Sequence, residues 1–206
     1  MKFPVHIEIA PSGTPPAKIT HELFFVEKQD KPRLLEKITT EYRGSMLIFS
    51  RTKYGARKIT SGIRALGHTV AEIHSNRSLN QRREALDGFR NGKYRILVAT
   101  DIAARGIDVK GIELVLNYDL PQSPEDYVHR IGRTGRVQSV GHAISFATPD
   151  QKGEVRGIER LIRATLPLST LPAGLPPARA PIQRPYLRSQ SDYPQRHDSF
   201  GPRRFN

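Results

Sequence analysis

Five short apolar runs, rich in β-branched residues, alternate with longer segments in which apolar residues recur every three or four positions. This alternation is typical of α/β domains, in which helices join parallel strands and cover the sheet. We therefore expect a parallel β-sheet with helices on both of its faces. The expected strands are MLIFS (46–50), TVAEIH (69–74), RILVAT (95–100), LVLNYDL (114–120) and HAISFAT (142–148).

The segments between these runs carry helix signals. Each has apolar residues at spacings that place them on one side of a helix, which is the side expected to face the sheet. One segment also has Ser123 as a helix cap, followed by Pro124 and two acids that favour the positive end of the helix dipole. The predicted helices cover residues 54–66, 80–92, 123–132 and 150–166.

Charge indicates the kind of partner. The chain has 206 residues and a formal net charge of +13, which favours a polyanion such as nucleic acid. It contains no cysteine, and its seven histidines show no metal-ligand spacing, so we expect no metal site. No apolar run is long enough to span a membrane, and the first residues lack the apolar core of a signal peptide. We expect a cytoplasmic protein with no membrane contact.

The composition changes after residue 166. Residues 167–206 hold half of the sixteen prolines, six arginines, no lysine and only two acids. So few aliphatic residues cannot offset the entropy of ordering the segment, and we expect a disordered basic tail. Its arginines and aromatic residues are suited to RNA, although a solubilising tail without a partner would have a similar composition. We expect a hinge and a first strand in residues 1–30, and the domain itself in residues 31–166.

The stretch YVHRIGRTGR, residues 127–136, places three arginines and a histidine within ten residues. A solvated basic face is the simplest interpretation, although like charges on one helix repel each other slightly. A second notable stretch, IAARGID, follows the predicted strand 95–100, where Asp108 could accept hydrogen bonds from a sugar and Thr100 could donate one to a phosphate. Ligands of open parallel sheets bind at such strand ends, but Thr and Asp there can also simply cap a helix.

Together these stretches resemble a known family. ILVATDIAARGIDV (96–109) is similar to motif V of the DEAD-box RNA helicases, and YVHRIGRTGR is similar to their motif VI. MLIFSRTKYGA (46–56) resembles motif IV, and HSNRSLNQRREALDGFRNG (74–92) resembles the segment that follows it. The resemblance extends from about residue 7 to residue 166 and implies a RecA-like fold. The amino-acid sequence of these segments is most similar to the bacterial RhlE-like group, and His129 favours the DEAD-box branch over related helicases.

The resemblance implies a role for each matching residue. Two arginines would act as fingers on the γ-phosphate of ATP, a role that suits a planar, permanently charged group. Two further residues would bind the nucleotide, two would couple the domain to its partner domain, and four would hold phosphates of single-stranded RNA. In that order, these residues are Arg133 and Arg136; Gly106 and Asp108; His129 and Arg130; and Arg51, Thr52, Arg82 and Thr100.

The chain departs from the family pattern at two positions of the segment after motif IV. Ser75 stands where the family has a glycine, and Leu79 stands where the family has a glutamine that contacts RNA. Leucine has no side-chain hydrogen-bonding group, so that RNA contact is not expected here.

A larger departure is the lack of a GxxxxGK[ST] phosphate loop and of a DEAD sequence, which DEAD-box enzymes need to hold ATP and Mg²⁺. We therefore expect a monomeric carboxy-terminal half of an ATP-dependent RNA helicase, inactive alone and dependent on an N-terminal domain that holds ATP with Mg²⁺. Its RNA substrate would be single-stranded or locally duplex. The alternative is a stand-alone RNA-binding or regulatory module without ATP turnover.

Overall fold

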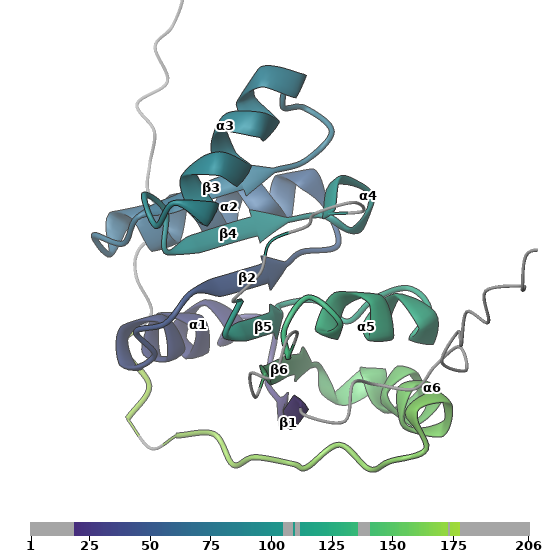
Figure 1. The fold of residues 1–206 in the computed structure, drawn as a ribbon. Coiled ribbons are helices and arrows are strands. Elements are labelled where there is room, and N and C mark those ends of the chain that lie inside the picture. Colours follow the sequence, from purple (N-terminus) through teal and green to yellow (C-terminus); the bar gives the residue numbers. More distant parts are fainter. Residues whose placement is uncertain (1–18, 105–108, 110–111, 136–140, 173, 178–206) are drawn as a thin grey trace, which may run out of the picture.

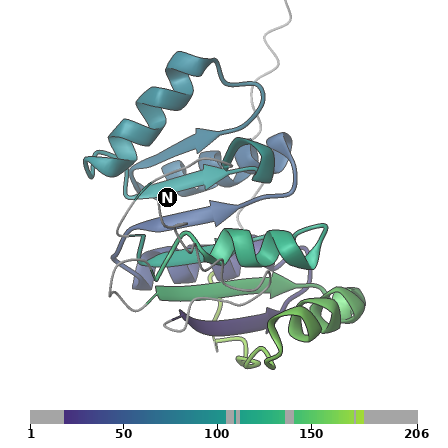
Figure 2. The same ribbon diagram turned by 45° about the vertical axis from the view of Figure 1, so that its right-hand side comes forward.

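A computed structural model describes residues 19–104, 109, 112–135, 141–172 and 174–177. At its centre lies a six-stranded sheet in the order β1-β6-β5-β2-β4-β3, and all five strand pairs are parallel (Figures 1 and 2). The strands are β1 (Ile19–Phe25), β2 (Met46–Phe49), β3 (Val70–Ile73), β4 (Ile96–Ala99), β5 (Leu114–Asn117) and β6 (Gly141–Ala147).

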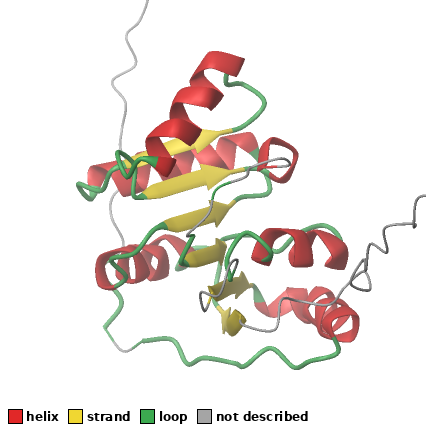
Figure 3. Ribbon diagram, in the orientation of Figure 1, coloured by secondary structure: helices red, strands yellow, loops and turns green. Residues whose placement is uncertain are grey.

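Helices cover both faces of this sheet (Figure 3). One face packs against two helices and the other against four, as the membership of three buried apolar clusters shows. On the first face lie α1 (Lys31–Glu41) and α2 (Lys53–Ala65). On the second lie α3 (Leu79–Arg90), α4 (Asp101–Ala104), α5 (Pro124–Ile131) and α6 (Lys152–Ile162), the last preceded by a short 3-10 helix at Pro149–Gln151.

The strands explain why the chain forms a sheet that is buried on both sides. Every residue of β2, β3, β4 and β5 is buried. Neighbouring residues alternate between the faces: Met46 and Ile48 contact the α1 and α2 side, whereas Leu47 and Phe49 contact the α3 side. Continuous apolar runs of this kind are typical of parallel sheets. The expected RecA-like α/β fold, with helices on both faces, is confirmed.

Side-chain caps fix where three helices begin. The Thr52 hydroxyl accepts a hydrogen bond from the Gly55 N–H at the start of α2, and Ser78 forms a capping box with Gln81 at the start of α3. Ser123 caps α5 by accepting from the Asp126 N–H, as the sequence predicts. Since each cap lies just after a strand or its loop, these three helices start at the carboxyl edge of the sheet.

The structure contains one long helix, α1, that the sequence pattern did not predict. Its apolar residues Leu34, Leu35 and Ile38 are buried, and Pro32 lies in its first turn. The proline and the preceding Asp30 are the sequence signal that could have identified the start of this helix.

Some of the described residues beyond the predicted boundary at residue 166 contact the domain. Leu23 of β1 donates its N–H to Pro167 O at 2.8 Å and accepts from the Ser169 N–H at 2.8 Å. Arg33 then donates to the carbonyls of Leu175 and Pro176, and Leu175 packs against the core. Figure 1 shows this segment running from α6 towards α1. Residues 178–206 lie outside the described residues.

Within the described residues, no helix is long and apolar enough to cross a membrane.

Residues 167–177 should contribute measurably to stability. We expect a chain ended after Leu166 to lose about 2–4 kcal/mol of unfolding free energy, because it loses two backbone hydrogen bonds, the Arg33 contacts and the burial of Leu175. A chain ended after Pro177 keeps all of these contacts and should match the full chain. Urea unfolding followed by circular dichroism measures the difference, and equal midpoints for the two shortened chains would contradict the assignment.

Candidate functional site

Most of the predicted site residues that the structure describes lie at or near the carboxyl edge of the sheet. Since all strands are parallel, their carboxyl ends share one edge, where open α/β sheets bind ligands. Arg51 and Thr52 follow β2, and Thr100 follows β4. His129 and Arg130 lie in α5, with Arg133 just beyond it. We call this edge and the helix starts on it the carboxyl rim.

Arg130 is the most deeply buried charge of the rim, with 2% of its surface exposed. Its guanidinium forms a two-pronged ion pair with Asp101, with Nε 2.5 Å from Oδ1 and Nη2 2.8 Å from Oδ2. It also donates to Asn117 Oδ1 at 3.0 Å and to the Asp119 carbonyl at 2.6 Å. The ring centroid of Phe49 lies 4.9 Å from the guanidinium carbon. Arg130 therefore ties the ends of β2, β4 and β5 to α5.

This burial bears on the role expected for Arg130. The resemblance implies contact with a partner domain, whereas the described contacts of its guanidinium all lie within this domain. Any coupling role would therefore act through the groups it holds, above all Asp101, which is only partly buried.

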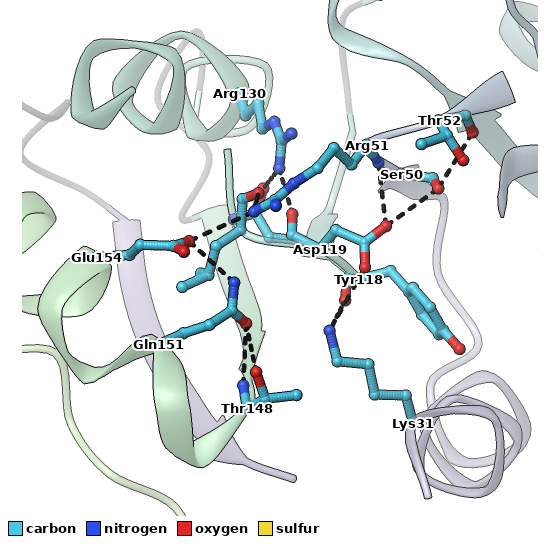
Figure 4. A network of polar contacts seen from close by, with 12 residues as sticks. Lys31, Ser50, Arg51, Thr52, Tyr118, Asp119, Arg130, Thr148, Gln151 and Glu154 are labelled. Atoms are coloured by element: carbon cyan, nitrogen blue, oxygen red, sulfur yellow. Dashed lines mark hydrogen bonds and ion pairs between the residues drawn. The ribbon is translucent and has the colours of Figure 1, made fainter. Parts of the chain in front are cut away.

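Asp119 forms a second centre of contacts, beside the first (Figure 4). Its carboxylate accepts from the Ser50 hydroxyl at 3.2 Å, from the Arg51 N–H at 3.0 Å and from Lys31 Nζ at 3.4 Å. Lys31 also donates to the Tyr118 carbonyl at 2.9 Å. Burial of Lys31 lowers the pKa of its ammonium group, and this effect is larger than the opposite effect of the nearby Asp119 carboxylate. Asp119 thus binds both the residues that follow β2 and Lys31 at the start of α1.

Arg51 reaches out from this network to the surface. Its guanidinium donates to the Leu120 carbonyl at 3.1 Å and lies 3.4 Å from Glu154 of α6, as Figure 4 shows. Gln151 donates to the same carboxylate at 2.9 Å. Because the Arg51–Glu154 pair is solvent-exposed, it contributes little energy, and the arginine can exchange its partner for an anion at small cost.

The other candidate phosphate contacts differ in how accessible they are. Thr52 is exposed, and while its oxygen caps α2, its hydroxyl hydrogen can still be donated. Arg82 of α3 is half-buried and donates to the Ala103 carbonyl of α4 at 3.3 Å. Thr100 is also half-buried, and its carbonyl accepts from the first turn of α4. The structure places all three on the carboxyl rim.

Arg133 and His129 lie beside a cavity of about 190 Å³. Its other lining residues are Phe49, Asp101, Ala104, Asp126 and Arg130. The His129 side chain is 73% exposed, with its Nδ1 3.9 Å from Asp126. Gly135, two residues after Arg133, has φ +68°, a conformation that favours glycine and so explains that residue of the motif. The cavity is therefore lined by Arg133, by the exposed His129 and by the Arg130–Asp101 ion pair.

Three predicted residues lie outside the described residues: Gly106, Asp108 and Arg136. Their expected roles at the nucleotide stay predictions. The described part of the chain also holds no group of three or more acidic or histidine side chains able to bind a metal. The described residues therefore do not supply a set of magnesium ligands.

Sequence reasoning did not identify the acids that hold the rim together. Asp101 and Asp119 are not among the predicted site residues, yet they bind Arg130, Ser50, Arg51 and Lys31. The available signal was indirect: an arginine on a helix that packs against a sheet needs a carboxylate partner if it is buried.

Fold and rim together define a class, the carboxy-terminal RecA-like domain of a helicase. Residues 30–138 match the family model described as "Helicase conserved C-terminal domain", and the chain belongs to that family. It contains the C-terminal domain of a DEAD-box RNA helicase.

Individual relatives agree with this assignment. The chain is 38% identical, over 193 residues, to the ATP-dependent RNA helicase RhlB of Vibrio vulnificus (strain YJ016), covering 92% of this chain and 44% of that relative. The structure of the E. coli DEAD-box protein SrmB bound to the regulator RraA has a TM-score of 0.72 at 28% identity, covering 80% of this chain and 98% of that one. S. cerevisiae Dbp5 bound to RNA and ADP BeF3 has a TM-score of 0.71 at 30% identity, covering 79% and 44%.

The Arg130–Asp101 pair should be essential for stability. We expect Asp101→Ala to lower the unfolding free energy by about 3–5 kcal/mol, because it leaves a buried guanidinium without its counter-charge. Asp101→Asn should cost less, because an amide oxygen can still accept one of the two hydrogen bonds. Urea unfolding of the purified variants provides the measurement.

The matched control is Asp87→Ala, which breaks the exposed Asp87–Arg90 pair of α3. Its effect should stay within about 0.5 kcal/mol. If Asp101→Ala and Asp87→Ala cost the same, the buried pair does not hold the rim together.

Proposed function

We propose that this chain is the carboxy-terminal half of an ATP-dependent RNA helicase, which supplies finger arginines to ATP and part of the surface that binds single-stranded RNA. The observation that carries the proposal is that Arg133 lines the same cavity as the Arg130–Asp101 pair, which lies at the ends of β4 and β5, beside the phosphate-binding candidates. The match covers 44% of the RhlB relative. Because the printed sequence has no GxxxxGK[ST] or DEAD motif, the proposed turnover uses a first helicase domain that holds ATP with Mg²⁺.

On the nucleotide side, Arg133 and Arg136 act as fingers on the γ-phosphate, and Asp108 with Gly106 receives the ribose. A fixed guanidinium can neutralise the charge that develops on the phosphoryl oxygens during transfer. His129 is well placed to contact the first domain because its side chain is exposed beside the cavity. Arg130 couples the domains indirectly, by holding Asp101 and Phe49 in place.

On the RNA side, Arg51, Thr52, Arg82 and Thr100 hold successive phosphates of one strand. Contacts to the phosphates do not read the sequence, so binding is tolerant of sequence and weakens steeply as salt rises. The similarity to Dbp5, whose structure contains RNA and ADP BeF3, supports this proposal. Closure of the two domains on ATP bends the bound strand and opens local duplex, and hydrolysis releases it.

The alternative is an RNA-binding or regulatory module without turnover. The net charge of +13 favours it as much as it favours a helicase half, because basic surfaces bind RNA without any ATP chemistry. We also propose a cytoplasmic monomer. The RhlE-like subgroup stays a prediction, as the curated relative reported above is named RhlB.

Arg133→Ala separates the helicase half from the RNA-binding module. We expect the substitution, in this chain fused to a DEAD-box first domain, to lower RNA-stimulated ATP turnover by about 10³-fold or more, the effect typical of finger arginines. RNA affinity should change by less than about twofold, since Arg133 is not among the residues proposed to contact the phosphates of the RNA. A coupled ATPase assay and fluorescence anisotropy measure the two quantities.

Arg90→Ala serves as the control, because Arg90 ends α3 at the opposite edge of the sheet. It should leave both turnover and RNA binding unchanged. Loss of RNA binding in Arg133→Ala, with turnover retained, would refute the finger assignment.

A further inference from the structure

Exposed apolar side chains are concentrated on the carboxyl rim. Among the described residues, five large apolar side chains are exposed, and three of them are Tyr54 at 71%, Leu79 at 60% and Ile102 at 81%. Each lies in the first turn of the helix that follows a strand: α2, α3 and α4, respectively. The strands they follow, β2, β3 and β4, are neighbours in the sheet. The three side chains therefore stand along one part of the rim.

Contacts between these helix starts join them into one surface. Lys53, next to Tyr54, donates from Nζ to Asn76 Oδ1 at 3.1 Å, which links the start of α2 to the loop before α3. Arg82, one turn after Leu79, donates to the Ala103 carbonyl, which links α3 to α4 beside Ile102. Lys53, Asn76 and Arg82 thus lie near the exposed apolar side chains. A surface of this kind suits a ligand that has both phosphates and flat apolar groups.

Tyr54 has the chemistry to bind the flat part. Its ring has the Lys53 ammonium 5.3 Å from its centroid, yet most of the side chain stays open to solvent. The ring stands two residues from Thr52, a proposed phosphate contact. Aromatic side chains beside a cationic track stack on unpaired bases, and this stacking tolerates any sequence. Scattered exposed apolar residues are common on proteins, but Tyr54 lies beside the Lys53 ammonium and close to Thr52 in the sequence.

We infer that Tyr54 stacks on an unpaired base of the bound strand, with Leu79 and Ile102 completing an apolar track beside the phosphate contacts. This inference rests on the proposed RNA binding and extends it from the backbone to the bases. Leu79 occupies the position where the family has a polar RNA contact, so the apolar track replaces a hydrogen bond with burial of the base or ribose. Binding then depends on the presence of bases, although not on their order.

The test compares two ligands on the full 206-residue chain by fluorescence anisotropy. One is a labelled single-stranded RNA, and the other is the same ribose–phosphate chain without bases. We expect Tyr54→Ala to bind the RNA about tenfold more weakly and the baseless chain within about twofold of the parent protein. Tyr54→Phe keeps the ring and should match the parent on both ligands.

Arg51→Ala is the matched control, since a phosphate contact weakens both ligands by the same factor. Equal effects of Tyr54→Ala on both ligands, or no effect on either, would overturn the stacking inference and leave RNA binding in place. Failure of the parent chain to bind either ligand would overturn the proposed RNA binding, and the inference with it. Thermal unfolding checks that the variants are folded; Tyr54 is exposed on α2, and alanine suits a helix.

Discussion

The guanidinium of Arg130 carries a permanent charge into the interior of the domain, and the shape of the carboxyl rim follows from satisfying it. An unpaired charge in that position would cost several kcal/mol, so folding has to bring acceptors to it. Asp101 after β4, Asn117 and the Asp119 carbonyl at the end of β5, and the Phe49 ring at the end of β2 converge on this one group. Three strand ends are thereby fixed relative to α5 before any ligand binds.

Asp119 extends the same constraint to the residues proposed to hold RNA. Its carbonyl accepts from Arg130, while its carboxylate holds the Ser50 hydroxyl and the Arg51 backbone. A short chain of hydrogen bonds therefore links the cavity beside Arg133 to Arg51 and Thr52, the proposed contacts to RNA phosphates. In the proposed function, such a link would let one domain closure position both ligands, because neither part could move without breaking bonds in the other.

The sequence predicted those parts of the fold that follow from local pattern. The apolar runs of β2 to β6 and the stripes of four helices were recognisable because burial leaves a regular period. Helix α1 and the segment after Leu166 were missed for a different reason: their order depends on distant partners. In the proline-rich described residues 167–172 and 174–177, the contacts are with the open edge of β1 and with Arg33, and neither contact can be predicted from composition.

For the candidate site, too, the sequence predicted some features, whereas others depend on contacts made only in the folded domain. Motif resemblance identified a set of residues that the structure places on the rim or beside its cavity, but it did not distinguish the buried Arg130 from the partly exposed Arg133. The set is Arg51, Thr52, Arg82, Thr100, His129, Arg130 and Arg133. That difference depends on Asp101, which is 29 positions away in the sequence. Tyr54 and Ile102 were overlooked because their exposure is a property of the folded rim. Gly106, Asp108 and Arg136 lie outside the described residues, so their roles rest on the resemblance alone.

The most direct test of the account is RNA-stimulated ATP hydrolysis, measured for this chain alone and again after fusion to a DEAD-box first domain. We expect no turnover by the chain alone and RNA-dependent turnover by the fusion, because the proposed finger arginines need a nucleotide held by the other domain. Turnover by the chain alone, or a correctly folded fusion that binds RNA and ATP without hydrolysis, would contradict it.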